Sequence, residues 1–368
     1  MDFRIFRHLP ALTLAAFLFV LGPARPACAQ DSPEKILLKD YRPKSIYKIP
    51  VTQIAKAKYW VIDMHSHDYA KTPEQIAEWV KNMDEVGIQK TVLLTGAVGP
   101  RFDEIHKQYS KYPDRFELWC GFDYTGYNEP GYPASAVKEL ERCYRAGARG
   151  VGEIIDKGKG LGWGKNRADG MHPDDARMDP LLEKCAELGM PVNIHVADPI
   201  WMYEKMDNTN DGLMNAYEWR LDNQPGIVGH SGMIDIIERA VKKHAKTKFI
   251  VCHFANLCYD LTRLGGMFDR NPNLYADISA RYAETATIPR FVSKFYAKYV
   301  GRLVYGTDMG YNTSMYRITF RVLESLDEHF YESEQFGYHW SMNGFGLPDK
   351  VLKQVYRDNA LKILKAGR

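Results

Sequence analysis

The chain has few cysteines, six in 368 residues, and the five that follow residue 29 show no paired spacing. An odd number without such spacing argues against a scaffold held together by disulfides. Cys120 and Cys252 lie inside apolar, strand-like runs, where a free cysteine behaves as a small buried hydrophobic side chain. We therefore expect the cysteines in the core, with a bridge between Cys143 and Cys185 as the alternative.

The chain also lacks an excess of charge of either sign. Its 49 lysines and arginines stand against 46 aspartates and glutamates, and no basic cluster of the kind that binds a phosphate backbone is present. The sequence thus gives no sign of a nucleic-acid partner; we expect a small-molecule substrate and leave homo-oligomerisation open. The 45% hydrophobic and 26% charged residues are typical of one large globular domain and argue against disorder.

Long apolar runs are absent except near the start of the chain, from Leu9 to Leu21, where Arg4 and Arg7 precede the run. Small residues at Ala27-Cys28-Ala29 match what a signal peptidase reads, so we expect residues 1–29 to be a signal peptide. An uncleaved anchor is the alternative, but the run is short for a bilayer. Cleavage predicts an exported protein, periplasmic or extracellular, with no stable membrane insertion and a net charge lowered from +3 to +1.

The remaining sequence divides into an N-terminal arm, residues 30–57, and one domain, residues 58–368. Eight apolar runs alternate with helical segments in this domain, at 59–68, 90–97, 116–124, 148–155, 190–198, 248–255, 273–279 and 302–309. Parallel strands that are buried on both faces have this continuous apolar character. The pattern predicts an α/β fold, a closed (β/α)8 TIM barrel with a C-terminal helix.

Two connections are longer than the others and follow the fourth and fifth runs. Residues 157–170 are rich in glycine, and we expect a long loop there rather than a simple linker. Residues 199–230 carry Trp201, Tyr203 and His230 and precede a helix expected from about Met233. This second insertion is our candidate for a lid.

Histidines and carboxylates lie at or near the ends of several runs. His65 and His67 are separated by one serine, so on a strand both project from one face and can bind one metal ion. Catalytic groups of barrels lie at the carboxyl ends of the strands, where four further polar residues fall: Glu153, His195, His253 and Asp308. Imidazoles with carboxylates suit zinc, with manganese or iron as alternatives, and one or two ions.

Five motifs occur in a specific order: DMHSH, NIH, CHFAN, YGTD and the tail LPDKVLKQVYRDNALKIL. In this order the sequence resembles the amidohydrolase superfamily, specifically the amidohydrolase-related branch of metal-dependent TIM-barrel hydrolases and decarboxylases. The resemblance implies that His65, His67, His195 and Asp308 hold a divalent cation. It also implies that His253 lies beside the bound water or substrate, or binds a second metal.

Glu153 occupies the strand-four position where related binuclear hydrolases place a bridging ligand. We expect it to be a ligand, and the alternative is a salt bridge with Arg149 or with a lysine of the loop. Hydrolysis of an ester, lactone or amide is the reaction we predict, with Asp308 shuttling the proton and His253 stabilising the oxyanion or orienting the water.

A decarboxylase acting on a carboxylated aromatic or muconate-like substrate is the alternative, as in aminocarboxymuconate semialdehyde and resorcylate decarboxylases of this branch. A non-catalytic binding protein is disfavoured because the ligand set is complete. Substrate contacts are expected from Arg281, since guanidinium matches a carboxylate, and from the loop aromatics Trp163, Trp201, Tyr203 and Tyr311. The alternatives are an ion pair of Arg281 with Glu284 and simple packing of the aromatic side chains.

Overall fold

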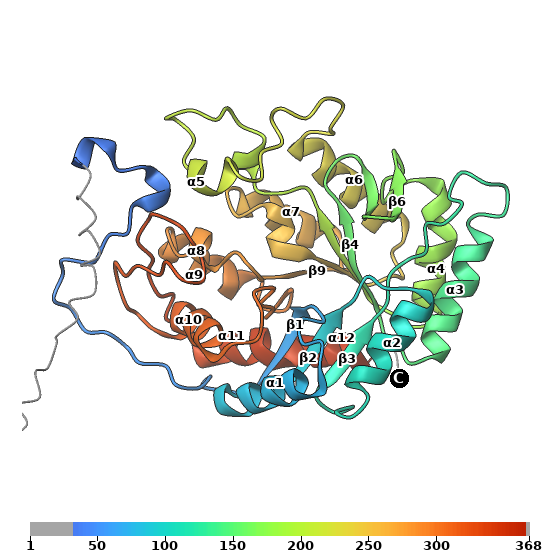
Figure 1. Cartoon of the computed structure of the whole chain (residues 1–368), viewed down its shortest axis with the longest axis horizontal. Helices are drawn as coiled ribbons and strands as arrows, with labels where there is room; N and C mark the ends of the chain where they lie inside the picture. The colour runs from blue at the N-terminus through green and yellow to red at the C-terminus, as the bar shows by residue number, and fades with distance from the viewer. Residues whose placement is uncertain (1–31, 366–368) are drawn as a thin grey trace, which may run out of the picture. The chain divides into compact units, whose positions relative to one another are not determined.

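The computed structural model describes residues 32–365, and the expected signal peptide lies outside them (Figure 1). The chain forms two compact units, one up to Tyr41 and the other from Arg42 onward. The described part of the first unit holds two short 3-10 helices, η1 (Pro33–Lys35) and η2 (Leu38–Asp40), with no buried residue in either helix. The second unit contains the predicted barrel.

Eight parallel strands form the barrel wall. They are β1 (Val61–Ser66), β2 (Ile88–Leu94), β3 (Phe116–Trp119), β4 (Val151–Asp156), β7 (Val192–Val196), β8 (Phe249–Val251), β9 (Leu274–Asp277) and β10 (Leu303–Val304). Hydrogen bonds order them as β1-β2-β3 and as β10-β9-β8-β7-β4. All eight strands agree with the runs expected from the sequence.

The two groups of strands meet at two seams without a continuous ladder, so the sheet is not fully closed. At one seam a single parallel bridge joins Cys120, after β3, to Val151 at the start of β4. At the other seam the Met64 amide of β1 donates a 2.9 Å hydrogen bond to the carbonyl of Tyr305, directly after β10. The arrangement is that of a (β/α)8 barrel with two loosely paired seams.

Helices lie outside the strands (Figure 1). α1 (Pro73–Val86) begins at a capping box in which Thr72 and Gln75 exchange side-chain and backbone hydrogen bonds, and Gly87, with φ of 89°, caps its C-terminal end. The others are α2 (Gly99–Tyr109), α3 (Ala134–Arg145), α4 (Asp179–Glu187), α6 (His230–Lys243), α7 (Leu261–Arg270), α8 (Tyr282–Thr285), α9 (Pro289–Lys298), α10 (Thr313–Glu324), α11 (Asp349–Lys353) and α12 (Asn359–Leu364). Over residues 32–365, no helix combines the length and the apolar character that a membrane span needs.

The expectation of a plain loop at 157–170 is wrong. β5 (Gly160–Trp163) and β6 (Asn166–Asp169) form an antiparallel hairpin there. Gly160 and Gly162 have φ of 116° and 93°, and a Cβ at either position would overlap a carbonyl oxygen of the opposite strand. Glycine therefore permits close pairing of the two strands rather than preventing it.

Two smaller corrections concern histidines. β8 ends at Val251, so His253 lies in the short turn η5 (Cys252–Asn256) that follows the strand rather than on the strand itself. His230 does not belong to the 199–230 insertion but forms the first residue of α6. The insertion contains η4 (Ile200–Met202) and α5 (Leu213–Ala216).

The five cysteines among the described residues are all free, and four of them are buried. The alternative bridge between Cys143 and Cys185 does not form. Part of the arm contacts the barrel domain, because both the amide and the hydroxyl of Thr52 donate to the carboxylate of Asp327, at 2.9 and 2.6 Å.

Candidate metal centre

His65, on β1, and His67, one residue past the end of that strand, present the same ring nitrogen to one point. His65 Nδ1 lies 2.9 Å from Asp277 Oδ2, and His67 Nδ1 lies 2.8 Å from the carbonyl of Leu94. Each Nδ1 therefore donates a proton, which leaves Nε2 as the nitrogen of each ring that can bind a metal. Nε2 of His65 is buried and has no hydrogen-bond partner among the described residues. A buried polar atom without a partner is costly, and a cation would satisfy it.

Two carboxylates face these nitrogens from across the barrel. Asp308 Oδ1, in the loop after β10, lies 3.0 Å from His67 Nε2 and 3.7 Å from His65 Nε2. Glu153 Oε1, from β4, lies 3.8 Å from His65 Nε2, and Glu153 Oε2 lies 3.6 Å from His67 Nε2. Ligand atoms that are each about 2.1 Å from one ion lie roughly 3 to 4 Å apart, so these separations suit a shared cation.

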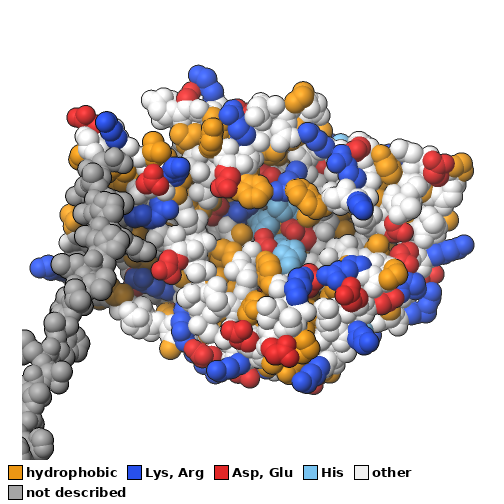
Figure 2. All heavy atoms as spheres, viewed as in Figure 1, with side chains coloured by type: hydrophobic (Ala, Val, Ile, Leu, Met, Phe, Trp, Pro, Cys, Tyr) orange, Lys and Arg blue, Asp and Glu red, His pale blue; other side chains and the backbone are white. Residues whose placement is uncertain are grey.

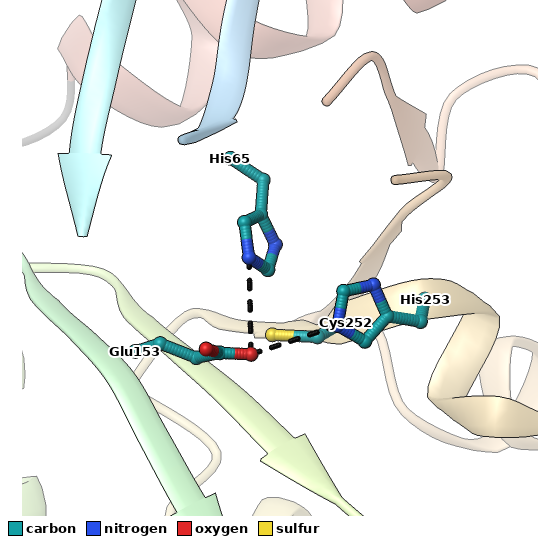
Figure 3. A group of neighbouring side chains, drawn as sticks. All are labelled: His65, Glu153, Cys252 and His253. Carbon is teal, nitrogen blue, oxygen red and sulfur yellow. Dashed lines mark ion pairs between the residues drawn. The ribbon is translucent and has the colours of Figure 1, made fainter. Parts of the chain in front are cut away.

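His253 also belongs to this cluster, and Figure 3 shows its ring pointing toward the Glu153 carboxylate. Its Nε2 lies 3.6 Å from Glu153 Oε1 and 3.7 Å from Asp308 Oδ2, and its Nδ1 lies 3.0 Å from the carbonyl of Ser279. Burial lowers the pKa of His253, which keeps the ring neutral and its Nε2 lone pair free to bind a metal.

The backbone holds His253 in an unusual conformation. Four consecutive non-glycine residues, from His253 to Asn256, have φ between 53° and 58°, in the left-handed region. Asn256 Nδ2 donates to the carbonyls of Val196 and Ala197, and the His253 amide donates to Asp277 Oδ1 at 3.0 Å. These bonds pin the turn to the neighbouring strands β7 and β9.

The ligand atoms fall into two groups, each with all atoms within 4.8 Å of one another. One group contains His65, His67 and Asp308, and the other contains His65, Glu153, Cys252 and His253. His65 belongs to both, and Glu153 lies within 4 Å of the nitrogens of both. The arrangement offers room for a pair of ions as well as for one.

His195 is close to this centre but lies in neither group. Its Nδ1 is 2.8 Å from Glu153 Oε1, and its Nε2 is 3.2 Å from Asp198 Oδ1, so both ring nitrogens face carboxylates. Burial alone would lower the pKa of His195, but Glu153 and Asp198 raise it to about 9. Nδ1 is the atom turned toward the centre.

Asp277 is a site residue that the sequence reasoning missed. It is fully buried, and it accepts hydrogen bonds from His65 Nδ1, Asn193 Nδ2, the amides of His253 and Ser279, and the Ser279 hydroxyl. A signal was available, because this aspartate interrupts an apolar run near its carboxyl end, as His195 does. Asp277 orients His65, as second-layer carboxylates commonly do for metal-binding histidines.

The carboxylates of the centre stay ionised. Burial alone would raise the pKa of Asp308, but His65, His67 and His253 lower it to about 2, and neighbouring histidines hold the pKa of Glu153 well below its usual range. A positive charge at this point is favoured, whether protons on the histidines or a bound cation carry it. The donor set of imidazoles and carboxylates fits a divalent metal.

Arg149 and Arg281 are both engaged within the protein. Arg149 donates to the carbonyls of Tyr144 and Ala148, so the salt bridge considered for Glu153 is absent over residues 32–365. Arg281 donates to Asn256 Oδ1 at 2.7 Å and lies 3.5 Å from a carboxylate oxygen of Glu284.

The aromatic residues predicted to contact the substrate lie in different surroundings. Tyr311 stacks on Trp79 with ring centroids 5.0 Å apart, and Trp201 lies 5.8 Å from Trp340. Trp163 alone of the predicted aromatic residues lines a cavity of about 300 Å³ together with His67 and Glu153. Figure 2 shows histidine side chains at the bottom of an opening on this face, with hydrophobic side chains beside it.

The family model described as Amidohydrolase matches residues 62–366. No curated protein matches the chain. Among solved structures, the chain is similar to 2,6-dihydroxybenzoate decarboxylase from Rhizobium, with 14% identity, 83% of this chain and 99% of that chain covered, and a TM-score of 0.54.

Two further structures give similar values. 5-Carboxyvanillate decarboxylase from Novosphingobium aromaticivorans DSM 12444, complexed with manganese, shows 16% identity, coverage of 86% and 100%, and a TM-score of 0.51. A candidate 2-pyrone-4,6-dicarboxylic acid hydrolase from Pseudomonas putida shows 14% identity, coverage of 83% and 98%, and a TM-score of 0.51. Identities this low establish the shared barrel fold and leave the reaction to be argued from the site.

Proposed function

Because the chain belongs to the amidohydrolase family, a family of metal-dependent enzymes, we propose that it is a hydrolase that uses a metal-activated water on an ester, lactone or amide. One observation supports this choice over other reactions of the fold. The Glu153 carboxylate from β4 points into the barrel, with His65 and His67 facing its two oxygens and His253 facing Oε1. A carboxylate so placed suits the bridge between two cations.

Residues of both groups would hold the ions. His65, His67 and Asp308 suit one cation. His253 Nε2 suits a second, joined by His195 Nδ1 from outside the two groups, with Glu153 between the two positions. Zinc is the ion we propose, with manganese or iron as alternatives. When bound, such an ion lowers the pKa of a coordinated water to about 7 and polarises the substrate carbonyl.

Asp308 is the residue we assign to proton transfer. Its Oδ1 lies 3.0 Å from His67 Nε2 and accepts a 3.2 Å hydrogen bond from the Tyr69 hydroxyl, which leaves Oδ2 to accept the proton of the attacking water. The proton then passes from Asp308 to the leaving group. His253, with Nδ1 donating to Ser279, offers a lone pair at Nε2, which suits metal binding better than donation to an oxyanion.

A decarboxylase remains the second candidate, and two contacts of His195 favour it. His195 lies between Glu153 and Asp198, at 2.8 and 3.2 Å, so a proton is shared within this group beside the centre. A single ion on His65, His67 and Asp308 would hold a carboxylated substrate, and the His195 group would deliver the proton to carbon.

Metal analysis of purified protein, together with a product screen, separates these two reactions. We expect close to two ions per chain, falling to one in Glu153→Gln, whereas Glu324→Gln keeps two. Glu324 is a matched control because it is a part-buried glutamate that accepts from Tyr356 and the Lys58 amide instead of facing the histidines. Hydrolysis of lactones, esters or amides without release of CO2 supports the proposal, whereas one ion with CO2 released from carboxylated aromatics would refute it.

A further inference from the structure

A second cavity lies beside the metal centre, between the β5–β6 hairpin and residues 218–227 of the insertion. Its volume of about 390 Å³ falls within the range of about 300 to 1,000 Å³ usual for small-molecule sites. Its wall is mostly apolar and includes two tryptophans: Leu161, Trp163, Trp219, Leu221 and Ile227. Trp163 and Trp219 are 69% and 59% exposed, far more than tryptophans that serve only as core.

This cavity adjoins the one at the metal centre. Ile155, Gly162 and Trp163 line both cavities, and the cavity at the metal centre also has His67 and Glu153 in its wall. A molecule whose reactive group lies at the ligand cluster can therefore reach the hairpin cavity past the Trp163 side chain. Trp163 stands at the boundary between the two cavities.

The hairpin that carries Trp163 is held at its base and near its tip. At the base, Asp156 Oδ1 accepts from the amides of Gly158 and Gly160, and Asp156 Oδ2 lies 2.6 Å from His172 Nδ1. Near the tip, Asn166 donates to the carbonyl of Phe122 and accepts from the Tyr124 amide, at 2.8 and 2.9 Å. The tryptophan is thus presented from a fixed hairpin rather than from a loose loop.

The basic side chains around the cavity give no indication of a polyanionic ligand. Four basic side chains line it, and three are paired: Lys157 with Asp198, Arg167 with Asp169, and Arg220 with Asp222. Lys157 Nζ also lies 6.0 Å from the ring centroid of Trp219. What the cavity offers in excess is aromatic surface, which binds planar rings through offset or edge-to-face contacts.

We propose that this cavity binds an aromatic ring of the substrate while the reacting group lies at the metal centre. The inference rests on the proposed function and narrows the substrate class to esters, lactones or amides that carry an aryl group separated from the reacting carbonyl. The ring packs against Trp163 and Trp219, and the spacer crosses the boundary at Gly162. The substrate is therefore a two-part molecule rather than a single ring on the metal.

Hydroxamates provide the test, because the hydroxamate group binds divalent metals and a phenyl group can be added at different chain lengths. Acetohydroxamate and a series of phenylalkyl hydroxamates are titrated calorimetrically into the zinc-loaded full chain. We expect the best phenylalkyl compound to bind about tenfold or more tightly than acetohydroxamate, as burial of one ring provides. Trp163→Ala and Trp219→Ala should each reduce this advantage below about threefold with metal content unchanged, and Trp219→Ala, which lies outside the cavity at the metal centre, should also leave acetohydroxamate affinity unchanged.

Trp60→Ala is the matched control. Trp60 is 37% exposed, lies beneath the Arg357 guanidinium and lines a cavity that includes Tyr59 and Gly87, away from the hairpin. The control should retain the full advantage of the phenyl group. A phenyl group that gives no advantage at any chain length, or an advantage that survives both tryptophan substitutions, overturns this inference alone. Failure of acetohydroxamate to bind at all would overturn the metal centre and the inference with it.

Discussion

Replacing Asp277 by asparagine tests whether the buried aspartate acts through the metal ligand that it orients. The substitution keeps the size of the side chain but removes the charge opposite His65 Nδ1, at 2.9 Å. All five hydrogen bonds described for Asp277 are accepted by its carboxylate. The NH2 group of an asparagine would therefore face other donors and could not accept these bonds. His65 then loses both basicity and orientation.

The expected magnitude comes from that one contact. A hydrogen bond to a charged group contributes about 1.5 to 3 kcal/mol, which corresponds to roughly 10- to 150-fold in an equilibrium constant. Loss of a second-layer partner of a metal ligand typically weakens metal affinity by about 10- to 100-fold. We therefore expect zinc to bind to Asp277→Asn about 10- to 100-fold more weakly than to the unaltered protein.

The assay is competition for zinc against a chromophoric chelator, at a temperature where all variants are folded. Asp179→Asn serves as the control, because Asp179 also pairs with a histidine, His244 Nε2 at 3.0 Å, but on the helical side of the barrel. The control should lose stability without losing zinc affinity. If Asp277→Asn binds zinc within threefold of the unaltered protein, Asp277 stabilises the fold only and its positioning role is refuted.

Three further predictions concern catalysis, stability and processing. Asp308→Asn keeps one coordinating oxygen but cannot accept the proton, so metal content should hold while turnover falls by about 10² to 10⁴; turnover near that of the unaltered protein with metal bound would remove the proton-transfer role. The hydrogen bond from His172 to Asp156 raises the pKa of His172 above 6.5, so its stabilisation is present below pH 6.5 and lost as pH rises through the raised pKa. The urea midpoint of His172→Gln should therefore fall below that of the unaltered protein by more at pH 5.5 than at pH 9, and equal differences would contradict this. Mass spectrometry of exported protein should give an N-terminus at Gln30, and an intact first residue would refute the signal peptide.

Much of the barrel could be predicted because its strands are buried on both faces and therefore read as continuous apolar runs. The run at 59–68 contains β1, and both histidines face one cluster although the strand ends at Ser66, one residue before His67. The barrel topology explains why ligands distant in sequence meet, since the strands end on the same face. The pattern could not show that His253 lies just past its strand, because the left-handed turn there contains no glycine to mark it.

The hairpin at 157–170 and Asp277 were missed for different reasons. Glycines usually weaken strands, so the glycines of this segment read as a loop, and only the close approach of the opposite backbone explains why they pair. Asp277 was overlooked because a single aspartate in an apolar run has many structural explanations. The role of Asp277 depends on its contact with the His65 ring, which is distant in the sequence. Arg281 shows the opposite kind of error. Its guanidinium is chemically suited to a substrate carboxylate, but in the structure it contacts Asn256 and Glu284.

The left-handed turn from His253 to Asn256 implies a trade-off between stability and activity. Left-handed backbone costs about 1 to 2 kcal/mol for each residue with a side chain, so the turn exists only because its hydrogen bonds to β7 and β9 hold it. Glycine at Ala255 would remove part of that cost and make the protein harder to unfold. It would also widen the range of positions open to the His253 imidazole. This turn is therefore a place where evolution or engineering can gain thermal tolerance at the expense of a well-positioned site.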